Sequence, residues 1–122
     1  MKLGSVAAIA GLIVFLATVN VAAAGSMMQA GPVFTDPGDV VDCAFNCPGT
    51  SDTTIQVKVV DGSGTAIYDS GPESCPAGSS GYAAASASGI LHCEVLGLSA
   101  KKATGTLYHF HGGAPIAVIP MH

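Results

Sequence analysis

The chain alternates between apolar and polar residues over short runs, and this pattern predicts strands. From Val33 onward, Gly, Pro, Asp or Ser interrupts the runs about every eight to twelve residues, which is typical of a β-sandwich or a β-barrel. The clearest run is 53–60, where Ile55, Val57 and Val59 alternate with polar positions. The run ends at 61–64 in Asp-Gly-Ser-Gly, where glycine permits the positive φ of a tight hairpin.

The same pattern predicts the other strands, and together they make an all-β fold. A short edge strand is expected near Val33, and further strands are expected at 39–47, 65–70, 79–87, 90–98, 104–111 and 114–119. This gives seven or eight strands. Residues 79–87 are rich in Ala and Ser, so only their position between two turns marks them as a strand. No stretch after residue 24 has the period of a helix.

The first 24 residues have the features of a signal peptide. Lys2 precedes an apolar run over 3–24, and Ala22 and Ala24 have the A-x-A spacing that signal peptidase cleaves. Cleavage after Ala24 would leave a lead at 25–31, expected to be flexible, and a folded domain at 32–122. The alternative is an uncleaved anchor, because this apolar run is also about long enough to cross a bilayer.

Charge and cysteine content limit the compartment and the partners. The chain has 4 Lys and no Arg against 8 acidic residues, and one of the lysines is Lys2, so a nucleic-acid partner is not expected. Membrane contact is expected only if the signal is retained. The 4 cysteines favour an oxidising space, so the protein is predicted to be secreted or periplasmic and disulfide-bonded.

Strand direction favours one pairing of the cysteines. Cys43 and Cys47 would lie about 13 Å apart on one extended strand, beyond the limit of about 7 Å for a disulfide. If every connection reverses direction, Cys43 meets Cys93 between the sheets, and Cys47 meets Cys75 at one pole. A wrong strand count between residues 47 and 93 would favour Cys43 with Cys75 and Cys47 with Cys93, so this alternative stays open.

The His-x-His pair at His109 and His111 is the strongest candidate for chemistry. Both side chains leave one face of a strand, a geometry that binds Zn or Cu when a third ligand converges. The candidates for that third ligand are His92, His122 and Met121. The alternative is that both histidines are surface or rim residues with no ligand, and no cofactor is then needed.

Other polar groups do not form a catalytic pattern, and no enzyme activity is predicted. No G-x-S-x-G motif is present for a serine nucleophile. Asp36, Asp39 and Asp42 could act as paired carboxylates or bind Ca²⁺ weakly, but they lack a D-x-D-x-D-G loop, and solvated charge near a strand edge is the simpler interpretation. The tyrosines are candidates for either a binding surface or packing at the edge of the core, and they are Tyr68, Tyr82 and Tyr108.

The predicted disulfide between two sheets resembles that of immunoglobulin-like sandwiches, in which a Cys on the second strand meets a Cys on the sixth. The chain is also similar to small secreted bacterial β-sandwich proteins for which no activity is known. The elements of that resemblance are Cys43 with Asn46, the 53–64 hairpin, Pro76-Ala77-Gly78, and Cys93 followed by Ser99-Ala100. We therefore expect an immunoglobulin-like antiparallel β-sandwich of seven or eight strands after the signal helix. Its expected role is that of a secreted, non-catalytic module that binds a surface, a protein partner or a ligand, or is structural, in the cell envelope or outside the cell. The alternative is a copper- or zinc-binding protein that uses His109 and His111.

Overall fold

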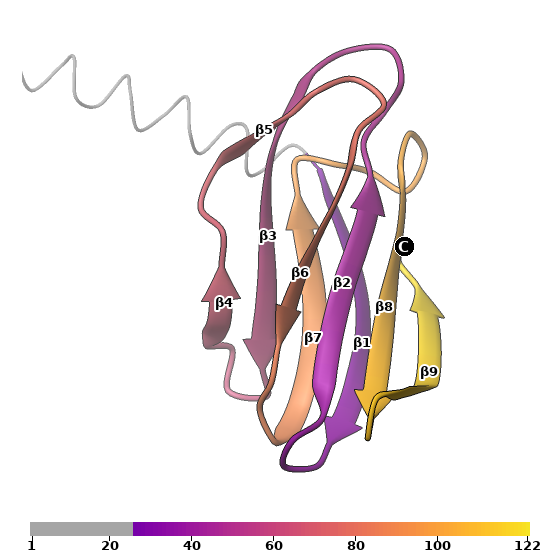
Figure 1. The fold of residues 1–122 in the computed structure, drawn as a ribbon. Coiled ribbons are helices and arrows are strands. Elements are labelled where there is room, and N and C mark those ends of the chain that lie inside the picture. The colour runs from indigo at the N-terminus through magenta and orange to yellow at the C-terminus, as the bar shows by residue number, and fades with distance from the viewer. Residues whose placement is uncertain (1–25) are drawn as a thin grey trace, which may run out of the picture.

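The computed structural model describes residues 26–122, which fold into two antiparallel β-sheets (Figure 1). These residues contain no helix, and therefore none that could cross a membrane. The predicted signal at 1–24 lies outside the described residues. The strands are β1 (Met27–Thr35), β2 (Val40–Asn46), β3 (Thr53–Asp61), β4 (Ala66–Asp69), β5 (Glu73–Cys75), β6 (Ser80–Ala85), β7 (Gly89–Leu96), β8 (Thr104–His111) and β9 (Ala114–Pro120).

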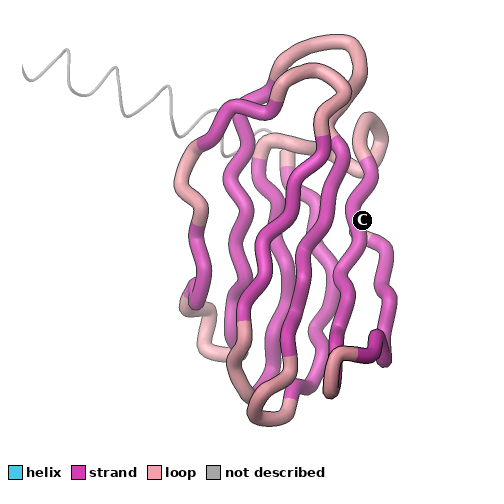
Figure 2. The backbone as a smooth tube through the Cα atoms, in the orientation of Figure 1, coloured by secondary structure: helices cyan, strands magenta, loops and turns pink. Residues whose placement is uncertain are grey.

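The two sheets form two layers with the core between them. One sheet has the order β1-β7-β3-β4, and β5 pairs with the other end of β3. The second sheet has the order β6-β2-β8-β9 and is the front layer in Figure 1. Long loops join β2 to β3 and β5 to β6 at the upper pole, while the β1–β2 and β8–β9 connections lie at the lower pole (Figure 2). The predicted all-β class is confirmed.

Alternation along the strands fills the space between the sheets. Ile55, Val57 and Val59 of β3 are buried, as their spacing predicts. On β7 and β2, too, every second side chain is buried between the sheets. Burial of such aliphatic side chains contributes about 1.5–3 kcal/mol each to folding. The largest fully buried side chains include Met28, Leu91, Leu107, Val41, Val59 and Val95.

Both predicted disulfides are present. Cys43 of β2 is bonded to Cys93 of β7 with a Cα–Cα distance of 5.8 Å, and this bond crosses the core between the two sheets. Cys47 is bonded to Cys75 at the upper pole with a Cα–Cα distance of 6.4 Å. The alternative pairing is therefore excluded, and no cysteine of the described chain is free. Two intramolecular disulfides are typical of extracellular and periplasmic proteins.

The prediction of a flexible lead at 25–31 is wrong for most of that segment. Strand β1 begins at Met27 and pairs with β7, and the side chains of Met28 and Ala30 lie in the core. The pairing register shifts between Ala30 and Val33, so the inward positions change parity at this bulge. A change of parity hides the two-residue period in the sequence, which is why the segment was not recognised as a strand.

A second difference concerns the number of strands. The described residues form nine strands where seven or eight were expected, because the short strand β5 was not predicted. Its three residues pair with the start of β3 and place Cys75 opposite Thr53. A strand of this length is too short to show a period of two. Both β4 and β5 pair antiparallel with β3 and therefore run in the same direction, so the extra strand adds no reversal and leaves the predicted disulfide pairing unchanged.

Candidate functional site

Two sites bring together polar side chains that are far apart in the sequence. The first is the carboxylate–histidine cluster at the lower pole, formed by Asp36, Asp39, His109 and His111. The second is an open groove on the outer face of the four-stranded sheet, which we call the tyrosine groove because Tyr82 and Tyr108 line it. The cluster is described first.

A tight turn positions the two carboxylates of the cluster. Asp36-Pro37-Gly38-Asp39 is closed by a hydrogen bond of 3.0 Å from the Asp39 N–H to the Asp36 carbonyl. Gly38 has a φ of +89°, which suits the third position of a type II turn, and Pro37 suits the second. The Asp36 N–H also donates to Asp39 Oδ2 at 3.0 Å. The turn therefore fixes Asp39 and holds Asp36 beside it.

Strand β8 supplies the two histidines, and both bind the same carboxylate. His109 Nε2 donates to Asp39 Oδ2 at 2.8 Å, and His111 Nδ1 lies 2.6 Å from Asp39 Oδ1. The two histidines leave one face of the strand, as predicted. They differ in exposure, because His109 is only 4% exposed whereas the His111 side chain is 57% exposed at the rim.

These contacts shift two pKa values in opposite directions. The pKa of Asp39 is lowered to about 2, mainly by the hydrogen bond from the Asp36 backbone and then by the one from His109. The pKa of His111 is raised, mainly by its hydrogen bond to Asp39 and by the charge of that carboxylate. The ionised carboxylate and the protonated imidazole of His111 stabilise each other.

The other predicted ligands do not join this cluster. His92 on β7 pairs with Glu94 at 2.8 Å and lines a separate small pocket together with His122. Met121 is buried in the core, where a Cβ on Gly105 would lie 2.6 Å from its sulfur. Binding of copper or zinc through His109 and His111 stays a prediction, but the structure adds Asp36 and Asp39 to the groups that lie within reach.

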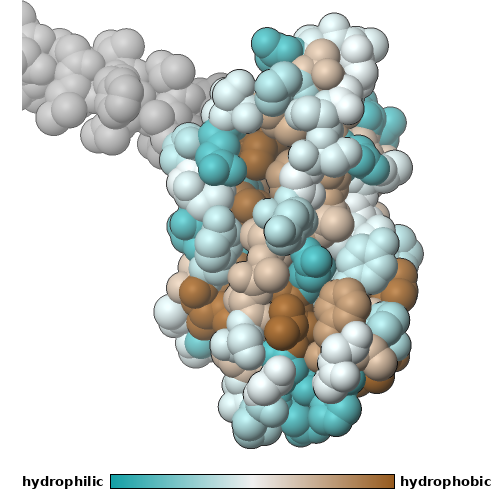
Figure 3. Space-filling model, in the orientation of Figure 1, coloured by the Kyte–Doolittle hydropathy of each residue, from teal (hydrophilic) through white to brown (hydrophobic). Residues whose placement is uncertain are grey.

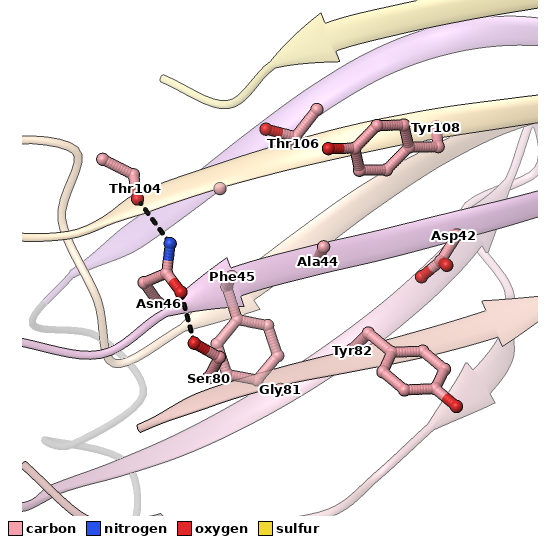
Figure 4. A pocket seen from close by; sticks show the side chains of 11 residues that line it. Asp42, Ala44, Phe45, Asn46, Ser80, Gly81, Tyr82, Thr104, Thr106 and Tyr108 are labelled. Atoms are coloured by element: carbon pink, nitrogen blue, oxygen red, sulfur yellow. Dashed lines mark hydrogen bonds between the residues drawn. The ribbon is translucent and has the colours of Figure 1, made fainter. Parts of the chain in front are cut away.

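The tyrosine groove crosses strands β6, β2 and β8 on the outer face of the sheet (Figure 4). Its volume is about 370 Å³. Figure 3 shows this face of the molecule, where apolar side chains lie among polar ones. Tyr82 is 71% exposed, and Tyr108 stacks on Phe110 with ring centroids 6.2 Å apart. The lining residues are Asp42, Ala44, Phe45, Asn46, Ser80, Gly81, Tyr82, Thr104, Gly105, Thr106 and Tyr108.

Of the described residues that line the groove, Asp42 is the only charged one. It projects from the middle strand of the three, directly across from Tyr108 on β8. Its Oδ1 atom is buried and has no hydrogen-bond partner among the described residues. Burial raises the pKa of this carboxyl, because removal of water disfavours the charged form. An unsatisfied carboxylate oxygen of this kind is unfavourable for folding.

The upper end of the groove is a neutral polar network. Asn46 Nδ2 donates to Thr104 Oγ1 at 3.0 Å, and the Ser80 hydroxyl donates to the amide oxygen of Asn46. Phe45 is a buried core residue whose ring packs against Gly81 below the groove, where a Cβ would lie only 2.7 Å from the ring. Gly81 therefore leaves the space that this ring occupies.

The sequence predicts the histidine pair but neither complete site. Asp42, Ala44 and Asn46 alternate along β2 with the buried Cys43 and Phe45, and they line the groove. The link from Asp39 to the histidines was missed, because it depends on β2 pairing with β8. That pairing sets Val40 opposite Phe110, so the preceding Asp39 lies beside His111.

Comparison of the chain with known protein families, with curated protein sequences and with solved structures finds no match.

Proposed function

We propose that this protein is an exported, non-catalytic module that binds an oligosaccharide-type ligand in the tyrosine groove. The observation that carries the proposal is Asp42, which lines the middle of an open groove between two tyrosines and whose buried Oδ1 has no partner among the described residues. Rotation of the Asp42 side chain would bring this oxygen to the groove, where a ligand would supply the missing donor, and binding sites have a few such polar groups among apolar ones.

The charge of the groove favours a neutral ligand with hydroxyl groups. Its lining, as far as the structure describes the chain, includes no Lys or Arg, so an anionic ligand such as a phosphate would meet only the charge of Asp42. Asn46, Ser80 and Thr104 offer both donors and acceptors, as a ligand with many hydroxyl groups requires. A sugar hydroxyl donates to the carboxylate without bringing a second charge into the groove.

The two tyrosines provide the apolar part of the surface. Each ring offers a flat apolar area with a polar hydroxyl at its tip, and few rotatable bonds have to be fixed on binding. Tyr82 is far more exposed than a tyrosine packed at the edge of a core. The C–H face of a sugar ring can lie on such a surface while its hydroxyls reach the polar network.

Two further observations support export and the immunoglobulin-like arrangement. The Cys43–Cys93 disulfide joins the two sheets of a small β fold, as in immunoglobulin-like sandwiches. Two disulfides also favour an oxidising compartment, in agreement with the signal peptide proposed for residues 1–24. Intact mass of the secreted protein tests the cleavage after Ala24, and a membrane-retained form that still carries residues 1–24 would contradict it.

The binding proposal is tested by NMR titration of the oxidised, isotopically labelled protein. The probes are neutral oligosaccharides of glucose and of N-acetylglucosamine. We expect amide shifts centred on β6, β2 and β8, and loss of those shifts in Tyr82→Ala and in Tyr108→Ala. Tyr68→Ala is the matched control, because Tyr68 is also exposed but lies on β4 of the other sheet. No shift with any probe, or equal binding by Tyr82→Ala, would contradict the proposal.

A further inference from the structure

We propose that Asp36, Asp39 and His111 form a binding site for one divalent transition-metal ion, with Zn²⁺ as the ion that suits these ligands. This site lies at the lower pole, at the turn between β1 and β2, and is separate from the tyrosine groove. It differs from the pair predicted from the sequence, because His109 supports a ligand and is not one itself.

The ligand atoms are already close together. One ligand atom from each of the three residues lies within 4.8 Å of the other two. Ligands of a tetrahedral zinc ion at about 2.1 Å lie about 3.4 Å from one another. The remaining adjustment falls on Asp36 and His111, which are exposed and therefore free to change rotamer. Asp39, which is buried, can stay in place.

The chain holds the central ligand in position. Asp39 is fixed by the Asp36 N–H and by His109 Nε2, which both donate to its Oδ2. Its Oδ1 contacts only His111 among the described residues, and a metal ion would replace that contact, with the Nδ1 proton of His111 released to solvent. His109 is thus a positioning residue, since a buried hydrogen-bond donor to a metal-binding carboxylate fixes the orientation of that carboxylate.

An ion pair between Asp39 and His111 does not account for Asp36. Within residues 26–122, the Asp36 carboxylate takes part in no hydrogen bond and no ion pair, yet the turn holds it beside a second carboxylate. Two adjacent carboxylates repel each other, and a protonated His111 offsets only one of the two negative charges. A bound divalent ion offsets both charges and leaves its fourth position open to water, as in zinc sites with three protein ligands.

The donor set selects the type of ion. One imidazole nitrogen and two carboxylate oxygens suit Zn²⁺, whereas Ca²⁺ takes six to eight oxygen ligands and Mg²⁺ requires an octahedral set of oxygens. The three protein ligands here are too few for Ca²⁺. The protein should therefore bind Zn²⁺ in preference to Ca²⁺ and Mg²⁺.

The test is calorimetric titration of the oxidised protein, without a polyhistidine tag, using ZnCl₂. We expect one Zn²⁺ per chain, and a loss of affinity of at least about tenfold in His111→Ala and in Asp36→Asn. Both replaced side chains are exposed, so the fold should be unchanged, and circular dichroism checks that it is. The matched control is His92→Ala, which removes a histidine that also pairs with a carboxylate but has no third ligand nearby within residues 26–122.

Three results would overturn the proposal. They are the absence of stoichiometric Zn²⁺ binding, unchanged affinity in His111→Ala, and a loss of affinity in His92→Ala that matches the loss in His111→Ala. Titration with CaCl₂ tests the type of ion, and affinity for Ca²⁺ equal to that for Zn²⁺ would contradict the ligand assignment. Since the probe is a metal ion alone, these results do not depend on whether the tyrosine groove binds a saccharide.

Discussion

Asp39 and Asp42 lie close together in the sequence, yet the fold treats their carboxylates in opposite ways. Asp39 precedes β2 and is 2% exposed, and both of its oxygens have hydrogen-bond partners. Asp42 lies within β2 on the outer face, and one of its oxygens has no partner in the described part of the chain. Accordingly the pKa of Asp39 is lowered and the pKa of Asp42 is raised.

The carboxylate of Asp39 therefore stabilises the fold, whereas the carboxylate of Asp42 is left available for a ligand. Asp39 joins the β1–β2 turn to β8 through His109, so its charge is part of what connects two elements far apart in the sequence. Among residues 26–122, no hydrogen bond joins the Asp42 side chain to another element, and its buried Oδ1 is unfavourable for folding. A polar group that opposes stability but faces an open groove is better explained by binding than by folding.

The largest expected effect on stability comes from removal of His109, the buried partner of Asp39. His109→Ala should lower the free energy of unfolding by about 3 kcal/mol, because it leaves a cavity and removes a donor from a buried carboxylate. Urea denaturation followed by circular dichroism measures the change. His92→Ala is the control, since its partly exposed pair with Glu94 should contribute no more than about 1 kcal/mol. Equal losses in the two variants would mean that the lower-pole contacts contribute no more to stability than the partly exposed pair of His92 with Glu94.

The next effect has the opposite sign and concerns Asp42. Asp42→Asn should raise the free energy of unfolding by about 0.5 kcal/mol at pH 7, because it removes a partly desolvated charge that solvent still screens. The folded-state pKa of Asp42 lies above its ordinary value of 3.8. The penalty is therefore absent below pH 3.8 and develops as pH rises through the folded pKa.

Denaturation of both proteins at pH 3 and pH 7 checks this sign. We expect the gain from Asp42→Asn at pH 7 only. A loss of stability at pH 7 would show that Asp42 has a stabilising partner, and the contrast with Asp39 would then fail.

The smallest expected effect separates binding from stability. Tyr82→Ala should change the free energy of unfolding by less than about 0.5 kcal/mol, because Tyr82 is 71% exposed. Thermal denaturation of this variant beside Tyr68→Ala measures the change. If Tyr82→Ala proved strongly destabilising, Tyr82 would be a packing residue, and its loss of ligand binding could no longer be attributed to the groove.

The parts of the fold that the sequence predicts are those that local alternation or strand direction determines. The buried positions of β3 and β7 follow from their period of two, and the disulfides follow from the parity of strand reversals. Strand β1 was missed where a bulge changes the parity of the inward positions, and β5 because three residues show no period.

The two sites depend on pairing between strands that are far apart in the sequence, so the sequence predicts them less well than it predicts the fold. Asp39 and His109 are 70 residues apart, and only the register of β2 with β8 brings them together. The groove needs Tyr82 from β6 and Tyr108 from β8 on the two sides of Asp42, and the weak Ala- and Ser-rich pattern around β6 gave no reason to place Tyr82 there. The Asp-Pro-Gly-Asp turn was the one local signal that could have marked Asp36 and Asp39 as neighbours.

The central claim is that Asp42 is left available while Asp39 is built into the fold. Titration of the aspartate carboxyl carbons by ¹³C NMR, in metal-free protein, tests both residues in one experiment, with Asp42→Asn to assign the signal. We expect Asp39 to titrate at about 2 and Asp42 above 3.8. If Asp42 titrates at or below 3.8, the carboxylate in the groove is solvated or already paired, and the argument for a ligand site around it is contradicted.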